Sequence, residues 1–355
     1  MIEGYYVEST DGLLFAVKGL IHPPVAVVAY LRYAPDPNGE RKRESIPYRR
    51  LYHFEEQEEL LRERCPYCLF DDSIFGERLQ GVPRERIRLV YDPCLKLAEL
   101  RRQEGLDELE EKAVEFADLL AGRAGVPESS TGISGSILVD LHTPRSDVDV
   151  VVYGSEHCRA VHGALRELLD EPPLPPQSWG GPGGGGEVRR PNEEETRELY
   201  ASRSQDTPMS FEDFVRLERR KVIQGRFRGC EYFIRFVKAC PEPYRRAPAE
   251  VGESYGDRRY TSLGQAEIEA TVADTSEAIF TPCTYRVEDV RFTDGAAVDD
   301  LREITSFRGR FCEQAQEGER AIARGKLERV VAREGEVYHR LLLGGRGDFM
   351  IVKVS

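Results

Sequence analysis

The stretch that decides the fold is TGISGSILVDLHTPRSDVDVVVYG, residues 131–154. It opens with a turn through Gly135 and Ser136 and continues into a short helical piece over 137–141. Its second half, Asp147 to Tyr153, combines two carboxylates with a run of valines and predicts a strand. The stretch therefore predicts a compact unit in which a turn and a short helix precede a buried strand.

Two carboxylates in this stretch predict a cation site. Asp147 and Asp149 are two residues apart, so an extended strand points both to one face, about 6.6 Å apart at roughly 3.3 Å per residue. Neighbouring carboxylates repel as anions unless a cation lies between them, and hard oxygen ligands suit Mg²⁺ or Mn²⁺. Gly135 and Ser136, at the start of a helical turn, predict backbone amides and a hydroxyl that face a phosphate. The spacing thus predicts that the metal-binding carboxylates and the phosphate-binding Gly-Ser turn lie close together.

Gly135-Ser136 followed by Ser146-Asp147-Val148-Asp149 resembles the signature of the DNA polymerase beta type nucleotidyltransferase superfamily. The whole chain also resembles a family of predicted archaeal nucleotidyltransferases. The segments that carry this wider likeness are GLLFAVKGLIHPP (12–24), GISGSILVDLHTPRSDVDVVVYG (132–154), RGRF (308–311) and ARGKLE (323–328).

The superfamily resemblance implies a two-metal mechanism in which a nucleoside monophosphate passes from an NTP to an acceptor hydroxyl. The acceptor is open between RNA, a protein and a small molecule. Asp147 and Asp149 would be the ligands of Mg²⁺ or Mn²⁺. Gly135 and Ser136 would hold the phosphates, with Ser146 beside them.

The resemblance fails at the third carboxylate, which superfamily enzymes usually place before an Ile-Arg pair. The comparable strand here is 231–236, and Phe233 stands at that position. Glu231 shares the face of Phe233 by strand alternation and is the candidate catalytic substitute, with Asp274 as a second candidate. If neither serves, the chain is a nucleotide-sensing or RNA-binding protein on the same fold.

A metal-dependent glycosyltransferase is a competing interpretation, since such enzymes also use a DxD to hold the diphosphate of a sugar nucleotide. They do not require Gly135-Ser136.

The length of 355 residues indicates two or three domains. We expect an α+β protein in which a central polymerase-beta-like domain, a mixed sheet with helices, occupies 94–240. An N-terminal β-rich region precedes it over 1–93, and a C-terminal small β-barrel follows over 241–355. A Pro/Gly-rich stretch over 171–191 predicts a loop. Apolar periodicity predicts helices over 55–64, 95–100, 106–120, 156–169, 192–202 and 211–224, and a strand over 230–237.

Composition narrows the class of partners. The net charge of −13 disfavours non-specific DNA binding. No apolar run reaches the 18 or so residues that span a bilayer, and the N-terminus lacks the pattern of a signal peptide, so we expect a cytoplasmic protein without membrane contact.

Other motifs stay open between a functional and a structural role. Cys65 and Cys68 form half of a zinc site that Cys94, Cys158 or His53 could complete, but two reduced thiols or a disulfide fit the pattern as well. The basic clusters 219–221 and 308–311 lie near aromatic residues and could grip single-stranded RNA or a triphosphate, or could be solvated surface.

Overall fold

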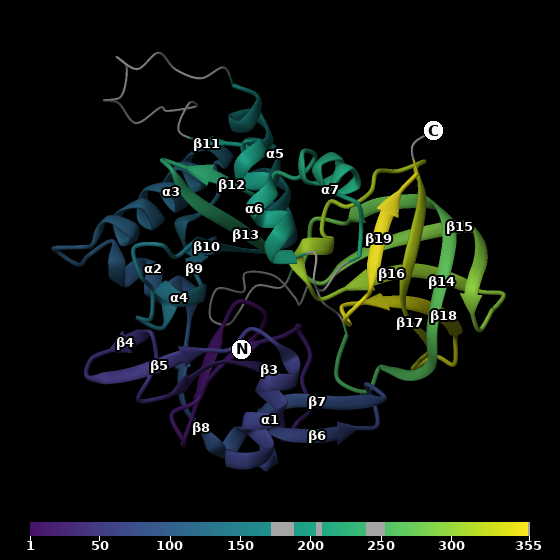
Figure 1. Ribbon diagram of the computed structural model, residues 1–355, viewed down its shortest axis with the longest axis horizontal. Coiled ribbons are helices and arrows are strands. Elements are labelled where there is room, and N and C mark those ends of the chain that lie inside the picture. Colours follow the sequence, from purple (N-terminus) through teal and green to yellow (C-terminus); the bar gives the residue numbers. More distant parts are fainter. Residues whose placement is uncertain (172–187, 204–207, 239–252, 354–355) are drawn as a thin grey trace. The chain divides into compact units, whose positions relative to one another are not determined.

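The computed structural model describes residues 1–171, 188–203, 208–238 and 253–353. Its architecture is α+β, with a curled N-terminal sheet, a central mixed sheet with helices and a ring-like C-terminal sheet (Figure 1). The chain forms two compact units. The first comprises Met1–Asp71, Arg78–Arg189 and Val222–Glu253, and the second comprises Asp72–Glu77, Arg190–Lys221 and Ser254–Ser355. The predicted α+β class and its three successive regions of secondary structure are confirmed at this level.

The N-terminal sheet is antiparallel and runs in the order β4-β5-β3-β2-β1-β8, with β7 paired to β3 and β6 paired to β7. Its strands are β1 (Tyr6–Ser9), β2 (Leu14–Val17), β3 (Ala26–Pro35), β4 (Arg41–Arg43), β5 (Ile46–Arg50), β6 (Leu69–Asp72), β7 (Glu77–Pro83) and β8 (Ile87–Tyr91). One face buries Val7, Phe15 and Leu31 in a core that includes Leu61 of helix α1 (Phe54–Arg64) and Val151 of the central sheet. The two sheets of the first unit therefore share one hydrophobic core.

The central sheet runs in the order β11-β12-β13-β10-β9, and β10 and β13 are parallel. Its strands are β9 (Thr131–Ile133), β10 (Val148–Tyr153), β11 (Val188–Arg189), β12 (Gln224–Phe227) and β13 (Cys230–Val237). The helices of this region are α2 (Pro93–Leu100), α3 (Glu108–Ala124), α4 (Gly135–Leu138) and α5 (Ser155–Asp170).

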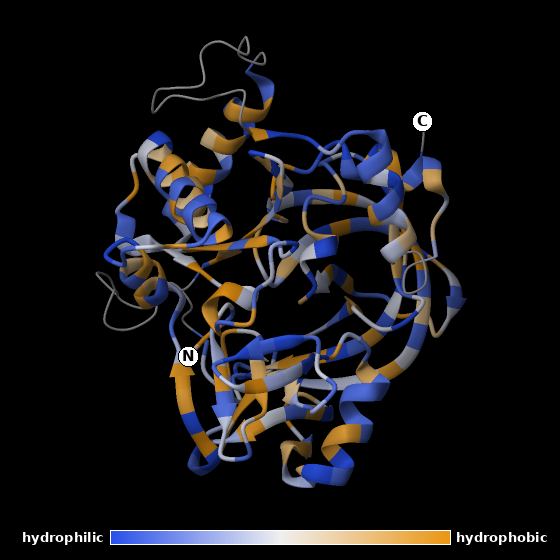
Figure 2. Cartoon of the chain, turned by 60° about the vertical axis from the view of Figure 1, so that its left-hand side comes forward, coloured by the Kyte–Doolittle hydropathy of each residue, from blue (hydrophilic) through white to orange (hydrophobic). Residues whose placement is uncertain are grey.

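Helices α3 and α5 contact each other and β10. Phe116 of α3 packs its ring 4.6 Å from that of Tyr232, which lies in register with Val148. The helices carry apolar and polar residues on different sides, as Figure 2 shows in orange and blue. The face of β10 that holds Val148, Val150 and Val152 is thus covered by helix, which leaves Asp149 on the opposite face.

The second unit contains helices α6 (Glu193–Arg203) and α7 (Phe211–Glu218) and the C-terminal sheet. The strands are β14 (Arg258–Glu277), β15 (Cys283–Gly295), β16 (Leu301–Ser306), β17 (Arg320–Ala332), β18 (Val337–Leu343) and β19 (Phe349–Val352). They follow the order β14-β15-β16-β18-β17-β19, and an additional pairing of β14 with β17 closes the ring.

Two local predictions need correction. The helix predicted over 211–224 ends at Glu218, because the Lys221 ammonium turns inward to bind Glu218 at 2.7 Å and the Arg310 carbonyl at 2.6 Å, and Gln224 already begins β12. The predicted loop over 171–191 lies mostly outside the described residues, but its Val188–Arg189 pairs with β12 as a strand.

Among the helices described, none is long and apolar enough to cross a membrane.

Candidate functional site

The candidate site is built by the segment that leads from β9 through α4 into β10. Strand β9 pairs antiparallel with β10, with Ile133 opposite Val150. After β9 the chain turns sharply, and the Ser134 amide donates a hydrogen bond of 2.8 Å to the Asp149 carbonyl. This bond holds the start of α4 beside the first residues of β10.

Gly135 lies in direct contact with the Asp149 carboxylate. Its backbone has φ +64°, and a Cβ placed there would lie 1.9 Å from Asp149 Oδ2. Only a residue without a side chain permits this approach and this left-handed backbone without strain. The Gly-Ser pair and the second carboxylate, 14 positions apart along the chain, are therefore neighbours in space.

Ser136 lies next in α4 and is 4% exposed, and its hydroxyl oxygen is buried without a hydrogen-bond partner. Buried polar atoms usually have partners, so the Ser136 hydroxyl retains an unused hydrogen-bonding capacity beside Gly135. Helix α4 has four residues, so its macrodipole attracts anions weakly. The attraction of α4 for a phosphate therefore rests on individual amide and hydroxyl groups rather than on a helix dipole.

The two carboxylates of the site have no protein partner in the described ranges. Neither Asp147 nor Asp149 accepts a side-chain hydrogen bond or forms an ion pair with a described residue, and both are half-buried. Burial and the charge of Asp147 raise the pKa of Asp149 to about 7, against the positive charges of Arg235, Arg50 and Arg32. Two neighbouring carboxylates without a described partner are the donor set that a hard divalent cation would bind.

The candidate third carboxylate, Glu231, is engaged by a cation on the neighbouring strand. Glu231 has a side chain that is 61% exposed and bound to Arg226 at 3.0 Å. Phe233 pairs in register with Asp149 and occupies the adjacent position on the same face of the sheet. Asp274 belongs to β14 of the second unit, where its carboxylate accepts the Ser276 amide at 2.6 Å.

Ser146 supports the turn that precedes β10. Its hydroxyl accepts the Thr143 amide at 3.0 Å and the Arg41 guanidinium at 3.3 Å. Arg41, from β4, also donates to the Leu141 carbonyl at 2.6 Å. The N-terminal sheet thus fixes the approach to Asp147, which no motif in the sequence indicated.

The comparison with known proteins gives a relative over nearly the whole chain. Uncharacterized protein MJ1086 of Methanocaldococcus jannaschii is 30% identical over 348 residues, which cover 96% of this chain and 94% of the relative. The chain belongs to the MJ1086 family. No protein-family model matches the chain, and no solved structure is significantly similar to it.

In this member of the MJ1086 family, one further cluster brings three potential metal ligands together within the described residues: Asp107, Glu110 and His142. Asp107 is the N-cap of α3 and accepts two backbone amides, and Glu110 completes a capping box with the Asp107 amide. His142 binds the other Asp107 oxygen at 2.7 Å. The cluster is accounted for as a helix cap.

Cys65 and Cys68 are buried in the hydrophobic core of the first unit. Burial raises the pKa of Cys68 to about 12. They belong to no group of three described metal ligands. The described part of the chain therefore adds no zinc ligand to this pair.

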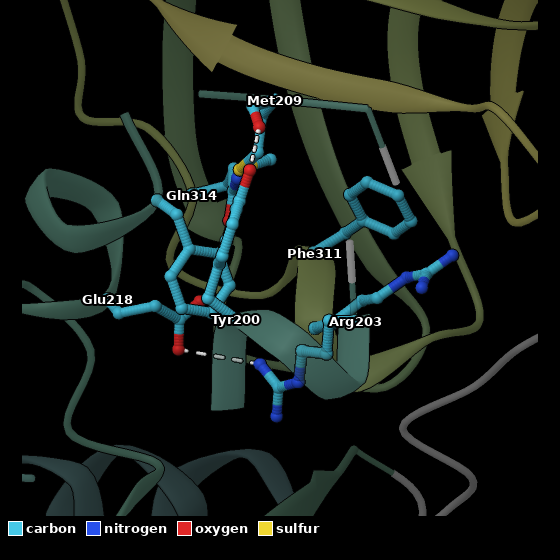
Figure 3. A pocket seen from close by; sticks show the side chains of 8 residues that line it. Tyr200, Arg203, Met209, Glu218, Phe311 and Gln314 are labelled. Carbon is cyan, nitrogen blue, oxygen red and sulfur yellow. Dashed lines mark hydrogen bonds and ion pairs between the residues drawn. The ribbon is translucent and has the colours of Figure 1, made fainter. Parts of the chain in front are cut away.

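Two residues of the basic cluster 219–221 are engaged within the second unit. Arg220 pairs with Glu319 at 2.6 Å, and Lys221 is 1% exposed and bound to Glu218. Figure 3 shows a small hollow there between α6, α7 and the turn at Phe311, in which Arg203 pairs with Glu218 at 3.4 Å. The charges of Arg203, Arg220 and Lys221 are therefore met within the second unit.

Proposed function

We propose that the chain is a metal-dependent nucleotidyltransferase of the polymerase beta type, which transfers a nucleoside monophosphate from an NTP to an acceptor hydroxyl. The observation that carries the proposal is the contact of Gly135 with Asp149, where a Cβ would lie 1.9 Å from the carboxylate. This contact brings the Gly-Ser pair and the second carboxylate of the sequence signature together in space. A chance Asp-x-Asp at the start of a strand has no reason to lie against a Gly-Ser turn.

The residues present fit a divalent cation. Asp147 and Asp149 offer oxygen ligands that no described residue engages. The pKa of Asp149 is raised by burial and by repulsion from the Asp147 charge, and a bound cation would offset both effects. Mg²⁺ at such a site supplies charge neutralisation at the phosphates and activation of the attacking hydroxyl.

The chain itself would orient the substrate. Asp147 and Asp149 are fixed by the start of β10, and Gly135 allows a phosphate to approach the backbone closely. The buried Ser136 hydroxyl can donate a hydrogen bond to a phosphate oxygen. Positioning of this kind is the main contribution a protein makes to phosphoryl-type transfer.

One observation favours a second candidate, a protein that binds NTP without transferring it. Phe233 stands in register with Asp149, and the Glu231 carboxylate is bound to Arg226. A site with two carboxylates can hold a metal–nucleotide complex yet lack the group that activates the acceptor.

Label transfer tests the proposal. The chain is incubated with each α-phosphate-labelled NTP, Mg²⁺ and a cell extract, beside Asp149→Asn and the control Gly163→Ala. Transfer by the wild type and by Gly163→Ala but not by Asp149→Asn supports the transferase, and the labelled material identifies the acceptor class. Equal labelling by Asp149→Asn refutes it. NTP binding without label favours the binding protein, and a preference for sugar nucleotides favours a glycosyltransferase.

A further inference from the structure

The N-terminal sheet lies against the segment that carries the Gly-Ser turn. Tyr6 of β1 and Tyr33 of β3 pack with Leu138 and Val139, three and four residues after Gly135. Both tyrosines are 6% exposed or less. One face of this sheet therefore covers α4, and polar side chains on the same face lie beside the carboxylate site.

Arg50 lies on that face. It ends β5 and pairs in register with Tyr33, and directly opposite residues in a sheet share a face. Its guanidinium lies 4.6 Å from the ring centre of Tyr52, and its Nε is buried without a hydrogen-bond partner. No described carboxylate comes within ion-pair distance of Arg50, although most arginines nearby, such as Arg43 and Arg49, have one.

Arg32 is placed beside this face by an irregularity of β3. The pairing of β2 with β3 shifts by one residue, so that Leu14 faces Tyr33 while Phe15 faces Leu31, and Arg32 is the additional residue. Its Nη1 reaches the Leu51 carbonyl at 3.5 Å. It too has no described ion-pair partner.

Two further cations of the region share one carboxylate. The buried Glu3 carboxylate binds Lys18 at 2.9 Å and Arg235 at 2.7 Å. Arg235 lies in register with Val151 and so shares the face of β10 that carries Asp149. Of the three arginines whose charge acts on the Asp149 carboxylate, Arg32 and Arg50 form no ion pair with a described carboxylate, whereas Arg235 binds Glu3.

The charges act on a common buried group. Burial raises the pKa of the Tyr6 hydroxyl, the Asp149 charge raises it further, and Arg32, Arg50 and Arg235 lower it. Opposite charges thus converge on Tyr6 without forming contact pairs. If a cation neutralises Asp147 and Asp149, the two arginines are left with positive charge directed toward the site, which is the field that a phosphate chain needs.

From this geometry we infer that Arg32 and Arg50, supplied by the N-terminal sheet, bind the polyphosphate chain of the nucleotide held at Asp147 and Asp149. The inference rests on the proposed function and assigns the N-terminal region a direct part in substrate binding. Planar guanidinium groups suit phosphate oxygens, and the partly buried setting strengthens each bond.

Calorimetric titration with inorganic tripolyphosphate and with ATP, each in Mg²⁺, tests the inference on the full chain. Arg50→Gln and Arg32→Gln are expected to weaken both affinities about tenfold to hundredfold, the range for a lost hydrogen bond to a charged group. Arg50→Lys should recover part of the affinity. Arg49→Gln is the matched control, since Arg49 is the preceding residue in β5 and binds Asp36 at 3.2 Å and Glu56.

The outcomes separate this inference from the proposed function. Wild-type affinity in both glutamine variants, equal loss in Arg49→Gln, or no tripolyphosphate binding by the wild type overturns the inference. Arginine-dependent ATP binding without label transfer leaves the inference standing and refutes the transferase. If Arg50→Gln does not fold, judged by its thermal unfolding, Arg50→Lys and Arg32→Gln decide.

Discussion

Gly135→Ala puts the geometry of the site to a quantitative test. The new methyl group would lie 1.9 Å from Asp149 Oδ2, 2.8 Å from its Cγ and 3.0 Å from its Cβ, and the backbone would stay at φ +64°. A left-handed conformation costs a residue with a side chain about 1–2 kcal/mol, and overpacking adds about 1–3 kcal/mol. The free energy of unfolding should therefore fall by about 2–5 kcal/mol.

The same change should displace the Asp149 carboxylate. Mg²⁺ affinity is expected to drop about tenfold to hundredfold, as it does when the support of a metal ligand is disturbed. Urea unfolding followed by circular dichroism gives the stability, and calorimetric titration with Mg²⁺ and ATP gives the affinity.

Gly163→Ala provides the matched control. Gly163 lies within α5, with nothing within 4 Å of an added Cβ, so alanine there should raise the free energy of unfolding by about 0.5–1 kcal/mol. Wild-type stability and wild-type Mg²⁺ affinity in Gly135→Ala would refute the proposed contact between the turn and the carboxylate.

Three further predictions follow from the contacts around the site and in the N-terminal sheet. Glu231→Gln should retain label transfer and change stability by no more than about 1 kcal/mol, since Glu231 is in an exposed pair with Arg226; loss of transfer would restore it as the third carboxylate. Phe233→Asp should strengthen Mg²⁺ binding in a direct titration, because it adds a carboxylate in register with Asp149, and unchanged affinity would contradict that placement. Burial opposes ionisation of Glu8, but hydrogen bonds from Tyr91 and Arg88 and the charge of Arg43 hold its pKa below the ordinary value. The interactions of ionised Glu8 therefore stabilise the fold above the pKa that Glu8 has in the unfolded chain, and this stabilisation is lost as pH falls through the lowered pKa of the folded state. Glu8→Gln should thus lower the free energy of unfolding by about 3 kcal/mol at pH 7 and change it little in strong acid. Urea titrations at several pH values measure this difference.

The regular elements could be predicted because local patterns fix them. The valines after Asp147 identified β10, and apolar spacing located α3 and α5 to within a few residues. The end of α7 was missed because a tertiary contact decides it: Lys221 turns inward to Glu218 and the Arg310 carbonyl.

The composition of the site beyond its motif could be predicted less well. Strand alternation placed Glu231 on the face of Phe233, but it could not show that Arg226, on the neighbouring strand β12, would bind the Glu231 carboxylate. The proposed contribution of Arg50 to phosphate binding depends on the register of β5 with β3 and on the packing of Tyr33 against the segment of α4. Neither of these long-range contacts can be predicted from the spacing of residues along the chain.

The central claim is that Asp147 and Asp149 hold a divalent cation beside a nucleotide. Electron paramagnetic resonance titration with Mn²⁺, with and without ATP, tests it most directly in the wild type and in the Asp147→Asn, Asp149→Asn double variant. We predict a Mn²⁺ site in the wild type that ATP strengthens and that the double variant lacks. Equal Mn²⁺ binding by the two proteins would contradict the claim.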